Sequence, residues 1–127
     1  MFRSTFCYNT PMKQQLIYIH GGQAFSRYEN FLEYLRTCEV RDPLGEPPKR
    51  WTATLREELG EDWDVYMPSM PNKQNAKYEE WKIWFERYLE LVDDGLVLLG
   101  WSQGGYFLLK YLSENDCPKR IGGLYLV

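Results

Sequence analysis

The chain has 127 residues, of which 44% are hydrophobic, 26% charged and 17% aromatic. This length and balance predict one globular domain and exclude a chain that is disordered throughout. The net charge of −3 has the wrong sign for a phosphate backbone, so nucleic acid is not an expected partner. No apolar run approaches the roughly 20 residues that cross a bilayer, so we expect no membrane partner either.

Residues 1 to 14 show no hydrophobic period and no apolar stretch of the secretory-signal type. We expect a flexible N-terminal segment there and a folded part at residues 15 to 127. The cysteines Cys7, Cys38 and Cys117 are odd in number and lack the spacing of a zinc site. A reducing, cytoplasmic location with neither disulfide nor metal follows as the expectation.

The first predicted strand is the apolar run from Leu16 to Ile19, which ends at His20-Gly21-Gly22. Ser26 and Glu29 have the spacing of a capping box and predict a helix that runs to about Cys38. Its apolar face is formed by residues at helical spacing: Tyr28, Phe31, Leu32 and Leu35.

Residues 39 to 50 are rich in proline and predict a loop. A short helix is then predicted from Trp51 to Leu59, with Gly60 as its stop, and a short strand at residues 64 to 67. Asn75 is the predicted cap of the next helix. The apolar face of that helix, which we expect to be core, consists of Trp81, Trp84, Phe85, Tyr88, Leu89 and Val92.

A third strand is predicted from Leu96 to Leu99, followed by a glycine-rich turn, a helix and a last strand at residues 121 to 127. Strands that alternate with helices predict an α/β fold: a doubly wound, mostly parallel sheet in three layers. With the common strand order 2-1-3-4, the loop at His20 would lie beside Ser102.

That turn, Gly100-x-Ser102-x-Gly104, matches the nucleophile elbow, in which a strained strand-to-helix turn lifts a serine hydroxyl above the sheet. The strand before it and the helix after it are the surroundings that this motif requires. The backbone N–H groups of Gly22 and Gln103 are the predicted donors to an oxyanion above the serine.

Through LIYIHGG at residues 16 to 22 and VLLGWSQGG at residues 97 to 105, the chain resembles the α/β-hydrolase superfamily. It is similar to the small, lid-poor serine hydrolases typified by the retinoblastoma-binding hydrolase, and DVYMPSMP at residues 64 to 71 is in keeping. The resemblance covers residues 15 to 127. It implies esterase-type acyl transfer on a small ester or amide, without cofactor, in which a histidine takes the serine proton and an acid orients that histidine.

The sequence departs from this family after Ser102. In the family the acid and the histidine follow the serine, whereas the single histidine here, His20, precedes it. Glu114 and Asp116 do follow Ser102, but at the far end of the predicted helix. We therefore expect a catalytically incomplete chain that is truncated before the strands that carry the acid and the histidine, and whose apolar last strand invites self-association.

Other interpretations stay open. A non-catalytic interaction protein could keep the fold and the elbow without the triad, and a phosphate- or nucleotide-binding domain could use the same crevice. His20 is a weak candidate for a pocket residue or a stand-in base. Trp101 either walls an acyl pocket or packs against the next strand.

Overall fold

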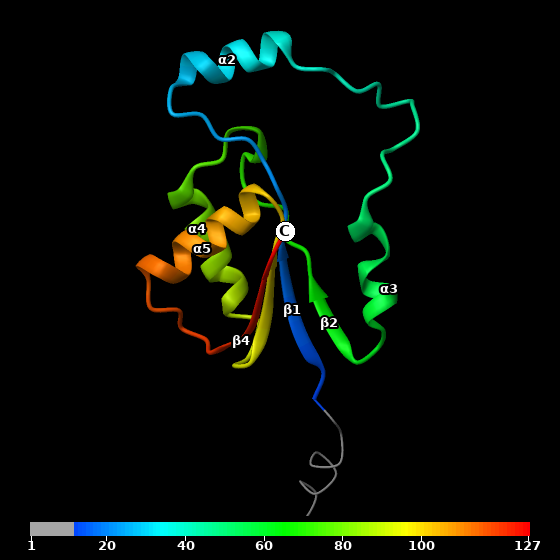
Figure 1. Ribbon diagram of the computed structural model, residues 1–127, viewed down its shortest axis with the longest axis vertical. Coiled ribbons are helices and arrows are strands. Elements are labelled where there is room, and N and C mark those ends of the chain that lie inside the picture. Colours follow the sequence, from blue (N-terminus) through cyan, green and yellow to red (C-terminus); the bar gives the residue numbers. More distant parts are fainter. Residues whose placement is uncertain (1–11) are drawn as a thin grey trace, which may run out of the picture.

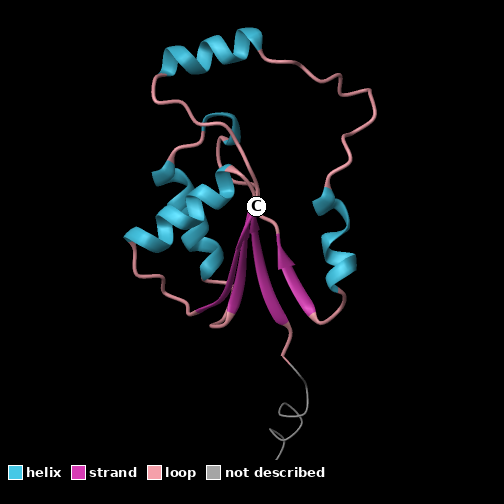
Figure 2. Ribbon diagram, in the orientation of Figure 1, coloured by secondary structure: helices cyan, strands magenta, loops and turns pink. Residues whose placement is uncertain are grey.

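The computed structural model describes residues 12–127, and its centre is a parallel sheet of four strands in the order β2-β1-β3-β4 (Figure 1, Figure 2). The α/β class and the predicted strand order are confirmed. Residues 1–11 of the expected flexible segment, Cys7 among them, lie outside the described part, and Gln14 already pairs with Trp63 in the sheet. The strands are β1 Gln14–Ile19, β2 Trp63–Tyr66, β3 Leu96–Gly100 and β4 Ile121–Leu126.

Helices cover both faces of the sheet, because the central strands are apolar on both sides (Figure 1). One face packs against α4 (Tyr78–Leu89) and α5 (Gln103–Glu114). The other face packs against the short α3 (Leu55–Leu59), which continues a 3-10 turn, η1 (Trp51–Thr54). The predicted short helix before Gly60 is thereby confirmed.

The larger core is built from aromatic side chains of α4 and α5. Phe85 is fully buried, and its ring centroid lies 5.5 Å from that of Phe107 and 5.0 Å from that of Tyr111. The Tyr111 hydroxyl donates to the Glu86 carboxylate at 2.9 Å, and burial together with this carboxylate raises the pKa of the phenol. Trp84 was expected in this core but is 39% exposed, so the buried face of α4 is narrower than predicted.

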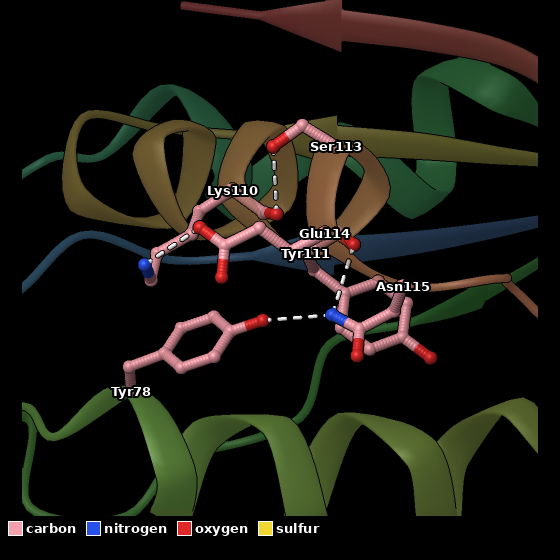
Figure 3. Close-up of polar contacts among 6 residues, drawn as sticks. All are labelled: Tyr78, Lys110, Tyr111, Ser113, Glu114 and Asn115. Atoms are coloured by element: carbon pink, nitrogen blue, oxygen red, sulfur yellow. Dashed lines mark hydrogen bonds and ion pairs between the residues drawn. The ribbon is translucent and has the colours of Figure 1, made fainter.

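Polar contacts tie the end of α5 to the start of α4 (Figure 3). The Asn115 side-chain amide donates to the Tyr78 hydroxyl at 2.9 Å and to the Tyr111 carbonyl at 3.1 Å. Lys110 Nζ lies 2.8 Å from a Glu114 carboxylate oxygen and sits 4.8 Å from the centre of the Tyr78 ring. The two helices therefore pack as one layer.

The helix α2 (Tyr28–Thr37) stands apart from the sheet, and none of its residues is buried (Figure 1). The predicted capping box is wrong: the N-cap is Arg27, with no side-chain cap hydrogen bond, so Ser26 and Glu29 do not pair around the helix start. The ring centroid of Phe25, in the preceding loop, lies 5.7 Å from that of Phe31 and 5.2 Å from that of Tyr34. The preceding loop thus packs on part of α2, whereas Tyr28 and Leu35 of the predicted apolar face are exposed.

The predicted cap at Asn75 is also wrong. Asn75 ends a 3-10 turn, η2 (Lys73–Asn75), and α4 begins at Tyr78 with Lys77 as its N-cap. The reason is a long-range backbone pairing: Gln23 N–H donates to the Lys73 carbonyl at 2.8 Å, and Ala76 N–H donates to the Gln23 carbonyl at 2.7 Å. These bonds hold the segment beside the loop that follows β1.

β4 is an edge strand of the described sheet, and its residues Leu124, Tyr125 and Leu126 are exposed. Self-association through this edge stays a prediction. No helix within residues 12–127 is long and apolar enough to cross a membrane.

Replacement of Phe85 by Ala should lower the free energy of unfolding by about 3–5 kcal/mol, because a fully buried ring leaves a cavity between α4 and α5. Ile83 on the same helix is 62% exposed, and Ile83→Ala should change stability by no more than about 0.5 kcal/mol. Urea unfolding followed by circular dichroism compares the two variants. Equal losses would contradict the assignment of the core.

Candidate functional site

Ser102 occupies the turn between β3 and α5 with φ 51° and ψ −117°. A positive φ at a residue with a side chain costs on the order of 1–3 kcal/mol and persists only where the surroundings enforce it. Here the Trp101 N–H donates to the Ile19 carbonyl at 3.0 Å, and the Ser102 N–H donates to the Val127 carbonyl at 2.7 Å. The turn is therefore fixed from the ends of both neighbouring strands, and the Ser102 side chain is left exposed.

Both motif glycines are sterically required at this turn. A Cβ atom on Gly100 would lie 2.5 Å from the Gly105 Cα. A Cβ atom on Gly104 would overlap the carbonyl oxygens of Ile19 and His20. The first turn of α5 thus packs directly on the backbone where β1 ends, and only glycine allows this approach.

The loop His20-Gly21-Gly22 lies beside the serine, as the strand order predicts. A Cβ atom on Gly21 would lie 3.5 Å from the Cβ atom of Ser102. Gly22 lines the same cleft as Ser102. The Gln103 N–H is at the first position of α5, where a helix offers no acceptor of its own. The structure thus brings the predicted donors and the serine to the same end of the sheet, while their roles stay predictions.

His20 also lines this cleft, but both of its ring nitrogens are engaged. The Met70 N–H donates to Nε2 at 2.9 Å, and Nδ1 lies 2.6 Å from the Gly21 carbonyl oxygen. Because a backbone N–H can only donate, Nε2 holds the lone pair and Nδ1 carries the proton. The ring also packs edge-on against Trp81, with the centroids 5.6 Å apart. These contacts favour a structural role for His20 and leave no free nitrogen to take the Ser102 proton.

A cavity of about 810 Å³ opens at the carboxyl ends of the strands, with Ser102 in its lining. Trp101 forms part of its wall: its ring centroid lies 5.7 Å from that of Trp51, which in turn meets Tyr18 edge-on at 5.7 Å. The contact with Trp51 favours the pocket-wall interpretation of Trp101. Trp51 was predicted only as a helix residue, and no local pattern indicates that it faces the cleft.

Cations line the cleft as well, and sequence reasoning missed all of them. Lys49 and Arg50 come from the end of the proline-rich loop and Lys73 from η2, and no carboxylate belongs to the lining. Burial raises the pKa of the Tyr18 phenol, and the nearby Arg50 guanidinium opposes that rise. Nothing in the local sequence marks these three residues, because distant segments bring them together.

The acidic residues after Ser102 do not reach it. Glu114 ends α5, a helix of 12 residues and hence about 18 Å in length, whose other end holds the serine. Its carboxylate is paired with Lys110 there (Figure 3). Asp116 lies further along the chain in the same direction. Within residues 12–127 no group of three or more His, Cys, Asp or Glu side chains is placed to hold a metal ion.

Comparison of the chain with protein-family models, with curated proteins and with solved structures finds no significant match.

Replacement of Gly104 by Ala should destabilise the protein by at least about 1–3 kcal/mol, because its methyl group would enter the carbonyl oxygens at the end of β1. Gly123→Ala is the matched control, since the nearest atom to its added Cβ would be Tyr125 Cε2 at 3.5 Å, an ordinary van der Waals contact. Urea midpoints of the two variants test this. A Gly104→Ala variant as stable as the control would refute the close approach of α5 to β1.

The tautomer of His20 provides a separate check. We expect the neutral ring to carry its proton on Nδ1, because Nε2 accepts from Met70. Two-bond ¹H–¹⁵N correlation spectra distinguish the two ring tautomers, and the single histidine makes the assignment unambiguous. A proton on Nε2 would show that Nε2 does not accept the Met70 N–H hydrogen bond. His20 would then again be a candidate for the base.

Proposed function

We propose that this chain carries the nucleophile and the oxyanion hole of an α/β-hydrolase-type serine hydrolase that acts on an ester or amide. The observation that carries the proposal is the positive φ of 51° at Ser102, at a strand-to-helix turn and at the edge of a cleft. A strained serine at this place is the defining geometry of a nucleophile elbow. The proposal also places the protein in a reducing, cytoplasmic compartment, in keeping with free thiols at Cys38 and Cys117.

The proposed reaction needs only side chains and backbone amides. The Ser102 oxygen attacks the substrate carbonyl carbon while a base takes the hydroxyl proton. The carbonyl oxygen becomes an oxyanion, and the N–H groups of Gly22 and Gln103 donate to it. The leaving alcohol or amine receives the proton from the base, and water then releases the acid from Ser102 by the same steps. The amino end of α5 adds a favourable dipole at the oxyanion.

The base and its orienting acid are part of the proposal, although residues 12–127 place neither beside Ser102. His20 is held by Met70 and Gly21, and Glu114 is at the far end of α5. We infer that a segment or partner outside these residues supplies both groups.

One observation favours the alternative of a phosphate or nucleotide binder. Lys49, Arg50 and Lys73 line the cleft into which the amino end of α5 faces, and such sites bind anions. A binder of this kind has no need for a strained serine, whereas an acyl-transfer enzyme does. A non-catalytic interaction protein that has lost the triad is the remaining alternative.

Ser102→Ala in the full protein should reduce hydrolysis of 4-nitrophenyl esters by at least about a thousandfold, because the acyl-enzyme can no longer form. Ser69→Ala is the matched control, since Ser69 is an exposed serine in the same cleft. A fluorophosphonate probe, with peptide mass spectrometry, should find its label on Ser102. Unlabelled Ser102 together with unchanged hydrolysis in Ser102→Ala would refute the proposal and leave a binding protein.

A further inference from the structure

The cleft beside Ser102 has a charge opposite to that of the chain. The whole chain carries a net charge of −3, whereas the charged residues of the cleft lining are Lys49, Arg50 and Lys73. No Asp or Glu belongs to the lining. A concave surface lined by one sign of charge concentrates ligands of the opposite sign.

These cations have no evident structural role. All three are exposed, and among the described residues none of them takes part in an ion pair. Elsewhere on the surface, cations such as Lys110 and Arg87 pair with a carboxylate within one helical turn. Like charges that line one cleft without a counter-charge repel each other, and a bound anion removes this cost.

The same cleft has an apolar side. The rings of Trp51 and Trp101 lie together in the wall next to Ser102, with Tyr18 against Trp51. An acyl chain can pack on these rings while its reacting carbonyl lies at the serine. The cations adjoin this aromatic wall: Lys49 and Arg50 directly precede Trp51 in the chain, and Lys73 comes from η2. A ligand that contacts both the aromatic rings and the cations has an apolar part and an anionic group.

We propose that the substrate is an anionic ester or amide: its acyl chain lies against Trp51 and Trp101, and a carboxylate or similar group meets Lys49, Arg50 and Lys73. This inference rests on the proposed hydrolase function and specifies its substrate class. Apart from Trp101, which lies within the predicted elbow, these side chains belong neither to the elbow nor to the oxyanion hole.

Binding of two matched esters to the Ser102→Ala variant tests the inference without turnover. Monomethyl glutarate carries one carboxylate, and dimethyl glutarate is its neutral counterpart. At low ionic strength the monomethyl ester should bind about tenfold more tightly, since each exposed ion pair contributes only modestly. Calorimetry measures both affinities. The preference should shrink in 1 M salt, because salt screens exposed charges.

The variant Lys49→Gln/Arg50→Gln/Lys73→Gln should lose the preference and keep its affinity for the neutral ester. Arg41→Gln is the control, because Arg41 is an exposed cation of the same loop that is not part of the cleft lining. All of these side chains are exposed, so the variants should unfold at the same urea concentration as the parent. Equal binding of the two esters, or a preference that survives neutralisation, would overturn the inference.

A third binding measurement uses inorganic phosphate and adenosine monophosphate as ligands. If either binds more tightly than monomethyl glutarate and loses that affinity in the triple variant, the cations serve a phosphate ligand and the ester assignment is wrong. The hydrolase proposal fails by a different result, namely hydrolysis that does not depend on Ser102. The binding preference therefore tests the substrate class, and the dependence of the hydrolysis rate on Ser102 separately tests the hydrolase proposal.

Discussion

The close approach of α5 to the end of β1 is the constraint on which the site depends. Gly104 lies directly on the carbonyl oxygens of Ile19 and His20, where no other residue has room. This contact requires β1 and β3 to be neighbours, so it is coupled to the strand order of the sheet. It also brings the loop after β1 beside Ser102. One steric condition thus links the sheet topology to the position of the serine and of both proposed amide donors.

The strain at Ser102 is sustained by the sheet around it. A positive φ of this kind costs on the order of 1–3 kcal/mol, and the burial of apolar side chains in the sheet offsets this cost. Ile17, Ile19 and Leu98 are completely buried in the two central strands, directly before the turns that form the site. The Trp101 and Ser102 N–H groups are bonded to Ile19 and Val127, so relaxing the serine would break pairings at both neighbouring strand ends.

The sequence predicts the strands and the elbow because their signals are local. The apolar runs at Leu16–Ile19 and Leu96–Leu99 and the glycine spacing around Ser102 each lie within a few residues. The capping box before α2 was wrong by one residue, since Arg27 and not Ser26 is the N-cap. The N-cap of α4 was misplaced because hydrogen bonds between distant segments outweigh the local signal: Gln23 holds residues 73–76 out of α4. The cleft wall was missed for the same reason. Trp51 and Lys73 meet there only after folding.

The contacts of His20 fit a proposed mechanism in which this loop supplies an oxyanion donor and not the base. In acyl transfer the base and the oxyanion donors approach the serine oxygen and the carbonyl oxygen from different sides. The loop after β1 presents the Gly22 amide, which places it on the oxyanion side of Ser102 in the proposed mechanism. The ring of His20 is turned to Met70 and Trp81 and holds that loop in place. In the proposed mechanism, a histidine held in this way would stabilise the loop that carries the Gly22 amide and would not act as the base.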